Sequence, residues 1–278
     1  MHKSRTFNRI KDLIYYTKKA DIVATSAQAA YFILLSLFPL LVFLITLIGY
    51  FPIDEDGFYD VLVYYTPQEV TDYIHTTVVD LIGTRNGSLL SISIIGTLWS
   101  ASNGINAIRR SLNHSYDVEE SRSYLYTKTI SIGLTIGFIF IIIIALILPV
   151  FGKLIFQYAA SIMELPTGFV WIWNLLRWGL STFVFFMILT ILFKLIPNTT
   201  VSFKNVMYGA LFSTLCLQIV SYIFSYYVGT IGNYSTTYGS LGTIIALMVW
   251  LYLAAMVILI GGVINAFMKE LKTNDLPQ

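Results

Sequence analysis

The chain has 278 residues and a formal net charge of +2, and 56% of its residues are hydrophobic while only 12% are charged. In soluble globular domains about a quarter of the residues are charged. This composition therefore excludes an ordinary soluble domain and predicts a polytopic membrane protein. The one cysteine, Cys216, lies in an apolar segment, so we expect no disulfide framework and no thiol metal site. We also expect no cofactor.

Residues 1–28 carry six basic side chains, and apolar residues recur between them at helical spacing. The segment is either a short basic amphipathic helix on the anionic cytoplasmic face of a membrane or an orientation signal only. The apolar run 29–50 that follows is too long for a signal peptide and has no cleavage site after it, so it remains as the first span. Pro39 inside this run removes one helix hydrogen bond and predicts a kink, with Ser36 near the freed carbonyls.

The longest polar insertion, residues 51–88, is acidic and holds a single basic residue, Arg85. Thr66 to Glu69 forms a capping box with proline at the first helical position, and apolar residues then share one helical face until Gly83. We therefore expect a short amphipathic helix on the outer side of the membrane.

Five further apolar segments follow the first span. The last of them has no charged residue from Tyr238 to Ala266 and exceeds the roughly 20 residues that a helix needs to cross the hydrocarbon core. The third is built on isoleucines and is the most featureless. The sequence thus predicts an all-α membrane protein with six transmembrane helices in one domain, residues 29–268, and a cytoplasmic tail, residues 269–278. The expected spans are 29–50, 88–105, 129–151, 176–196, 206–228 and 239–267.

Basic residues set the orientation of these spans. The segments expected on one side of the membrane hold 14 of the 17 lysines and arginines, and the loops expected on the other side hold two. Since positive residues accumulate in cytoplasmic segments, both termini are predicted to lie in the cytoplasm. The remaining one of the 17 basic residues is Arg177, at the outer end of the fourth span. It either anchors at the lipid headgroups or faces the bundle as an anion contact.

Two of the spans carry small and polar residues along one helical face. Each stripe either packs closely against another helix or lines a hydrated path. Near the end of the last span, Gly261 and Gly262 predict the close approach of a neighbouring helix. The two stripes consist of Ser93, Thr97, Ser100 and Asn103 in the second span and of Thr214, Gln218, Ser221 and Ser225 in the fifth.

Several short motifs follow one another between residues 20 and 268. They are SAQAAYFILLSLFPLL in the first span, WSAS at Trp99 to Ser102 with Asn113 downstream, LIPN at Leu195 to Asn198, and YGSLG and WLY in the last span. In their order and spacing they resemble the YihY/BrkB family of bacterial inner-membrane proteins. The residues that carry the match in the last span are Tyr238, Gly239, Ser240, Gly242, Trp250, Tyr252 and Asn265. The resemblance implies a six-helix, multi-pass protein of the bacterial cytoplasmic (inner) membrane.

Members of this family carry two labels, virulence-associated membrane protein and, as an old misattribution, ribonuclease BN. Phosphodiester hydrolysis needs clustered metal-binding side chains or a positioned acid and base, and two of the three histidines, His75 and His114, fall on opposite sides of the predicted membrane. We therefore expect no enzyme. Where many members have a glutamate near the end of the last span, this chain has Val263, which puts any proton-coupled mechanism resting on that acid in doubt.

Two functions remain open. The polar stripes, the kinked first span and the lack of a fully buried acid fit a path for a lipid or another amphiphilic or neutral solute better than a proton or sodium pump. The alternative is a non-transporting adaptor in envelope maintenance, whose acidic outer loop and basic inner tails bind other proteins. The expected partners are membrane lipids and, beyond them, a second copy of the chain or an envelope protein, but no nucleic acid.

Overall fold

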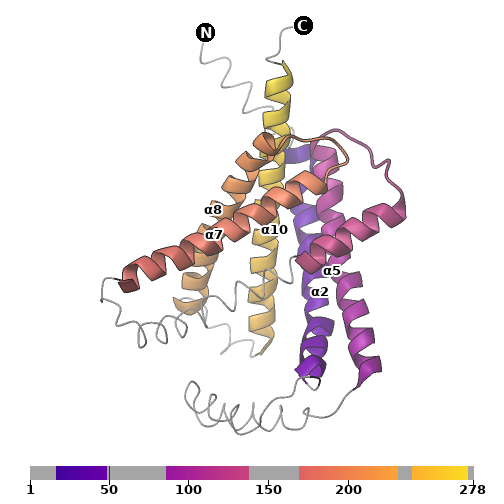
Figure 1. Cartoon of the computed structure of the whole chain (residues 1–278), viewed down its shortest axis with the longest axis vertical. Coiled ribbons are helices and arrows are strands. Elements are labelled where there is room, and N and C mark those ends of the chain that lie inside the picture. The colour runs from indigo at the N-terminus through magenta and orange to yellow at the C-terminus, as the bar shows by residue number, and fades with distance from the viewer. Residues whose placement is uncertain (1–16, 49, 51–85, 138–168, 231–239, 275–278) are drawn as a thin grey trace. The chain divides into compact units, whose positions relative to one another are not determined.

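The computed structural model describes residues 17–48, 50, 86–137, 169–230 and 240–274, and this part of the chain is built from helices (Figure 1). A further helical stretch, besides those with defined bounds, covers residues 124–137. The helices with defined bounds are α2 (Ile22–Ile48), α5 (Gly87–Ser115), α7 (Phe169–Leu195), α8 (Phe203–Thr230) and α10 (Ser240–Asn274). The predicted all-α class is thus confirmed for the described residues.

The chain divides into two compact units. Unit 1 consists of Met1–Phe32 and Ser102–Gln278, and unit 2 consists of Ile33–Ala101. Unit 1 therefore holds the stretch 124–137 and helices α7, α8 and α10, together with the first turns of α2 and the last turns of α5.

Several helices run past the predicted spans, most of all at the ends expected to face the cytoplasm. Helix α2 begins at Ile22 and α5 ends at Ser115, while α10 continues to Asn274. Spans predicted from apolar length mark only the part of a helix that fits the hydrocarbon core, so the polar end turns were not included. The predicted outer amphipathic helix, the acidic insertion around it and most of the basic amino-terminal segment lie outside the described residues.

Local signals explain where α5 begins and ends. At its start, the Asn86 side chain accepts a hydrogen bond from the Leu89 backbone N–H at 3.0 Å, which is an N-cap. At its end, the Val118 N–H donates to the Asn113 carbonyl, and Asp117 takes a left-handed φ of 55°. This is the Schellman arrangement, with aspartate in the position that glycine usually fills.

Among the described residues, four helical segments are long and apolar enough to cross a membrane, namely Ile22–Leu44, Trp178–Leu195, Phe203–Val228 and Ile244–Leu271. Large apolar side chains on α7 and α8 are exposed, among them Phe183, Leu211 and Ile219, which is typical of surfaces that contact lipid. Helix α5 has 29 residues but is too polar to belong to this group. Four of the six predicted spans therefore have the length and composition of a transmembrane helix in the described part of the chain. Most of the third predicted span lies outside that part, and the number six stays a prediction.

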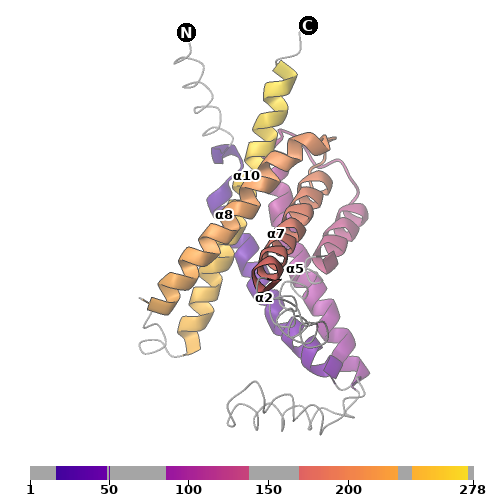
Figure 2. The ribbon, with the colours of Figure 1, turned by 60° about the vertical axis from the view of Figure 1, so that its left-hand side comes forward.

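The core of unit 1 includes the crossing of α8 and α10 (Figures 1 and 2). At this crossing Gly209 and Gly261 lie so close that a Cβ atom on Gly209 would stand 2.0 Å from the Gly261 carbonyl oxygen. The Gly209 N–H donates to the Asn265 side chain at 2.7 Å, and the Ser213 hydroxyl donates to the Val257 carbonyl at 3.1 Å. The close helix approach predicted at Gly261 is thus confirmed.

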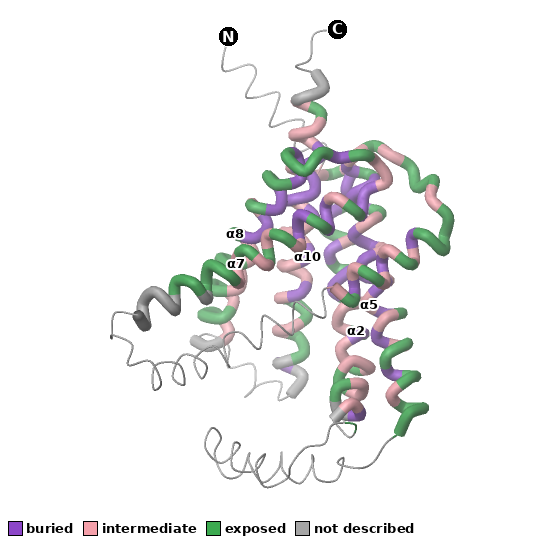
Figure 3. Tube along the Cα trace, in the orientation of Figure 1, coloured by how far each residue is buried: buried purple, intermediate pink, exposed green. Residues whose placement is uncertain are grey.

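Burial in unit 1 is concentrated near this crossing (Figure 3). In α8 the buried residues end at Thr214, and the later turns are half-buried or exposed. Helix α5 joins the same core, because a Cβ atom on Gly262 would stand 2.0 Å from the Leu112 side chain. The helices are therefore held together mainly toward the end that carries the first turns of α8.

In unit 2, Pro39 of α2 packs against Gly96 of α5. A Cβ atom on Gly96 would stand 3.4 Å from the Pro39 Cβ, and α2 continues through Pro39 to Ile48. The Ser36 hydroxyl donates to the Ile33 carbonyl at 2.6 Å. The carbonyl that loses its helical donor to proline is that of Leu35, so Ser36 lies near it but binds a different carbonyl.

Candidate functional site

Polar side chains join α5 to the helical stretch 124–137 within unit 1. The Lys128 ammonium donates to the Ser102 hydroxyl at 2.6 Å and lies 3.5 Å from the Asn103 side-chain oxygen. One turn further along, Ser131 and Asn106 are in hydrogen-bond contact at 2.8 Å. Ser102 and Ser131 are buried, so this is an interior contact. We name these five residues the polar seam.

The residue pattern of the third predicted span did not predict its contribution to this seam. Although that span reads as featureless, Thr127, Ser131 and Thr135 recur at every fourth position around its start and are buried. Their hydroxyls donate to carbonyls of their own helix. The Ser131 hydroxyl lies within hydrogen-bond distance of both the Thr127 carbonyl and the Asn106 side-chain oxygen, and its single proton can be donated to only one of them at a time. The four-residue spacing beside Lys128 is the sequence signal that marks this face.

One turn further along α5, two arginines share one carboxylate. Glu120 accepts hydrogen bonds from Arg122 Nε at 2.7 Å and Nη2 at 3.0 Å, and it lies 3.5 Å from Arg109 Nε. Burial opposes the ionisation of Glu120, but hydrogen bonds from Arg122 and Asn113 outweigh it and hold the pKa of this carboxyl below its usual value. We name Arg109, Glu120 and Arg122 the arginine–glutamate cluster.

One N–H donor group of the Arg109 guanidinium is left without an acceptor among the described residues. Its Nη1 atom is buried and has no hydrogen-bond partner among the described residues. Burial lowers the pKa of this guanidinium; nearby Glu120 raises it, while Arg122 and Arg110 lower it further. An arginine nevertheless stays charged at neutral pH, so a buried cationic N–H group is available to an acceptor.

Arg122 and Asn198 tie the connection after α7 to the connection after α5. Arg122 donates to the carbonyls of Leu195 and Ile196 at 3.3 and 2.7 Å, which have no helical donors because the helix ends before Pro197. The Asn198 N–H donates to the Asn113 side chain, 85 positions away, at 2.8 Å. The LIPN motif and Asn113 therefore meet in the folded chain.

Further contacts bring the other basic segments to the same end of unit 1. Lys19 pairs with Asp117 at 2.6 Å, and Lys269 donates to Thr199 at 2.8 Å. The start of α2, the end of α5, the turn between α7 and α8 and the end of α10 thus lie together (Figure 1). The segments that the sequence analysis assigned to one side of the membrane share one end of the unit, and the side that this end faces stays a prediction.

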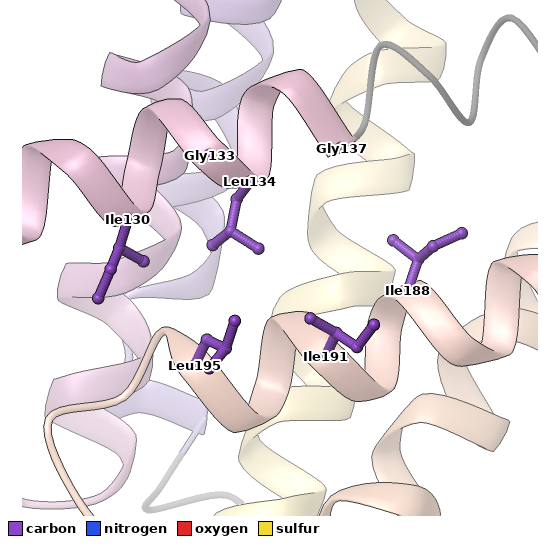
Figure 4. A pocket seen from close by; sticks show the side chains of 7 residues that line it. All are labelled: Ile130, Gly133, Leu134, Gly137, Ile188, Ile191 and Leu195. Atoms are coloured by element: carbon purple, nitrogen blue, oxygen red, sulfur yellow. The ribbon is translucent and has the colours of Figure 1, made fainter.

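An apolar groove of about 320 Å³ separates the stretch 124–137 from α7 (Figure 4). In Figure 4, Ile130 and Leu134 point toward α7, and Ile191 points back toward them. Gly133 and Gly137 have open space where a Cβ atom would stand. The lining residues are Ile130, Gly133, Leu134, Gly137, Ile188, Ile191 and Leu195. Because the Leu195 carbonyl binds Arg122, the groove ends beside the arginine–glutamate cluster.

The predicted stripe in α5 is divided between the two units. Ser93, Thr97 and Ser100 are buried, and the first two donate to the carbonyls of Leu90 and Ser93 in their own helix. Asn103 lies in unit 1, where it belongs to the polar seam. The choice between a packed and a hydrated stripe stays a prediction.

The predicted stripe in α8 contacts two neighbouring helices. Gln218 donates to Thr182 of α7 at 2.7 Å, and Ser221 accepts a hydrogen bond from the Trp250 indole of α10 at 3.2 Å. Thr214 donates to a carbonyl of its own helix, and Ser225 is exposed. Gln218, which is exposed, and Ser221 therefore take part in interhelical contacts, and the choice between a packed and a hydrated stripe stays a prediction for α8 as well.

Among the family-motif residues, Asn265 has the best-defined place, since it is fully buried and holds Gly209. Gly242 is buried and Tyr252 is half-buried. Val263 is 1% exposed within the apolar core, so an acid at this position would be an interior acid. Tyr238, Gly239 and the side chains of Ser240 and Arg177 lie outside the described residues.

Apolar helices with lipid-type surfaces, joined at one end by a basic polar cluster, define an integral membrane protein. The chain belongs to the family described as Virulence factor BrkB, whose model matches residues 13–278. The resemblance stated from the motifs is thus confirmed.

Two relatives illustrate how this chain is similar to other proteins. A protein of Bacillus subtilis (strain 168) that is named ribonuclease-like protein YfkH is 46% identical over 247 residues, which cover 89% of this chain and 90% of that protein. The UPF0761 membrane protein PSHAa0171 of Pseudoalteromonas translucida (strain TAC 125) is 26% identical over 277 residues, which cover 93% and 85% of the two chains. No solved structure matches the chain.

Proposed function

We propose that this protein translocates a lipid or another amphiphile across the bacterial cytoplasmic membrane, through or along its helix bundle. One observation carries the proposal: the stretch 124–137 has the polar seam on one face and the apolar groove on another. An amphiphile has to keep its headgroup in contact with polar groups and its chains in contact with apolar ones. A helix flanked by both kinds of surface offers these two environments side by side.

The alternatives meet specific difficulties. The name of the Bacillus relative mentions a ribonuclease-like protein, but Glu120, the carboxylate of the cluster, is bound by arginines that hold its pKa down, which makes it a poor general base near pH 7. An adaptor needs an exposed surface for a partner, whereas the seam and the groove are interior or apolar. Inert liposomes together with a co-purifying protein would favour the adaptor.

The orientation can be tested by cysteine labelling. With Cys216 first changed to alanine, Glu119→Cys, in the basic connection after α5, should react with a membrane-impermeant thiol reagent only after cells are opened. Asp56→Cys, in the acidic insertion, should react in intact cells, because basic segments are retained in the cytoplasm. Labelling of both positions from outside would contradict six spans with both termini in the cytoplasm.

The groove can be tested by filling it. Gly133→Leu and Gly137→Leu place a side chain where the structure has open space, so we expect most of the translocation of a labelled lipid in proteoliposomes to be lost while the protein stays folded. Gly179→Leu is the matched control, because Gly179 of α7 also has open space at its Cβ position but does not line the groove. Full activity in both groove variants would overturn the proposed path.

A further inference from the structure

We propose that the polar seam and the arginine–glutamate cluster bind the headgroup of an anionic lipid, whose chains occupy the adjoining apolar groove. This inference rests on the proposed function and adds the charge of the substrate to it.

The charges of the site are not balanced. The two arginines of the cluster share the single carboxylate of Glu120. Lys128 contacts the neutral oxygens of Ser102 and Asn103 and has no ion pair among the described residues. Within the described part of the chain, these three cations and one carboxylate leave two positive charges without a counter-charge. Partly buried charges are costly unless they are paired, so an anion is the missing partner.

The available donors suit a phosphate. Arg109 keeps a buried Nη1 group with no partner in the described part of the chain, and Lys128 has three N–H donors of which its two oxygen contacts use at most two. Hydrogen bonds from cationic donors to phosphate oxygens are about twice as strong as neutral ones. Lys128 and Arg109 are therefore assigned to the headgroup.

The groove decides between a free anion and a lipid. It runs along the same helix that carries Lys128, and its end residue Leu195 is bound through its carbonyl by Arg122. A free phosphate would make no favourable contact with this apolar surface, whereas the chains of a lipid would cover Ile130 and Ile191. Charge at one end and an apolar trough beside it match an anionic amphiphile.

Binding can be measured on the full chain in neutral detergent, as the rise in thermal midpoint on titration with phosphatidylglycerol or with phosphatidylcholine. We expect the wild type to bind phosphatidylglycerol more tightly, and Lys128→Gln to reduce this preference about fivefold, the effect of one lysine near an anionic lipid. Lys128→Arg should keep the preference. Lys204→Gln is the matched control, because Lys204 is an exposed cation at the same end of unit 1.

Equal binding of the two lipids by the wild type would overturn the inference, and this measurement does not depend on whether any variant folds. An equal loss of preference in Lys204→Gln would overturn it as well, since the attraction would then be diffuse. Stabilisation by inorganic phosphate alone at the same concentration would exclude a lipid-specific site. If phosphatidylcholine moved as fast as phosphatidylglycerol in proteoliposomes, the proposed translocation would stand and the preference for an anionic lipid would be overturned. If phosphatidylglycerol bound selectively but no lipid moved, the binding site would stand and the proposed translocation would be overturned.

Discussion

Replacing Gly209 by alanine is expected to separate α8 from α10 and to cost much more stability than the same change at Gly96 or Gly179, where an added Cβ atom meets no atom closer than 3.4 Å. The new Cβ atom would lie 2.0 Å from the Gly261 carbonyl oxygen and 2.6 Å from Asn265 Nδ2. The first of these atoms belongs to a helix backbone, which cannot move without shifting α10. Overpacking of a core costs about 1 to 3 kcal/mol and occasionally more, and the hydrogen bond to Asn265 would be strained too.

Two other glycines provide a graded control for this experiment. A Cβ atom on Gly262 would lie 2.0 Å from Leu112 Cδ2, the end of a flexible side chain, so Gly262→Ala should cost less than Gly209→Ala. A Cβ atom on Gly179 meets nothing within 4 Å, and Gly179→Ala should be neutral or slightly stabilising, since alanine favours helix. The order of stability of the three variants is measured by their thermal midpoints and by the monodisperse fraction of each in detergent. Equal midpoints for all three variants would contradict the crossing.

Replacing Glu120 by glutamine is expected to give the second largest effect. The carboxylate accepts hydrogen bonds from Arg122 and Asn113 and is the charge that balances Arg109 and Arg122. Glutamine keeps the shape but removes the charge and one acceptor site. Hydrogen bonds to charged groups contribute about 1.5 to 3 kcal/mol, so we expect a loss of about 2 kcal/mol at neutral pH, read as a lower thermal midpoint.

The same variant should change the response to acid. Because the pKa of Glu120 is lower in the folded protein than its usual value of 4.5, the stability that it contributes is complete above pH 4.5 and is lost as the pH falls through the folded value. The wild type should therefore lose part of its advantage over Glu120→Gln below pH 4.5. A difference between the two proteins that stayed constant down to pH 3 would contradict this assignment.

Asp117→Asn serves as the matched control for Glu120. Asp117 also pairs with a basic residue, Lys19, but its side chain is 79% exposed, and exposed ion pairs contribute little. Asparagine tolerates the left-handed φ of 55° at this position. We therefore expect Asp117→Asn to leave the thermal midpoint almost unchanged, which separates the loss of a partly buried counter-charge from the loss of any carboxylate at this end of the protein.

Sequence reasoning recovered the features that depend on single segments. The length of the apolar runs predicted six helices, and each of the six coincides with a helix in the described part of the chain, the third one over its first turns only. Gly261 correctly marked a close contact between helices. The third span reads as featureless because it is built on isoleucines, and the buried hydroxyls of Thr127 and Ser131 at its start donate to carbonyls nearby in the sequence, so they leave little trace in the hydropathy pattern. Their neighbour Lys128 was counted only as an orientation signal.

The sequence by itself determined that this chain is a membrane protein, which family it belongs to and where its basic residues gather, because apolar length, motif order and charge are properties of consecutive residues. Only the tertiary structure decided that Lys128 lies on Ser102, that LIPN meets Asn113 and that Gly209 touches Gly261. These pairs are distant in the chain, and a helix has several faces of similar composition. Packing between helices decides which face of one helix contacts which face of its neighbour. The same packing brings the polar seam and the groove next to each other.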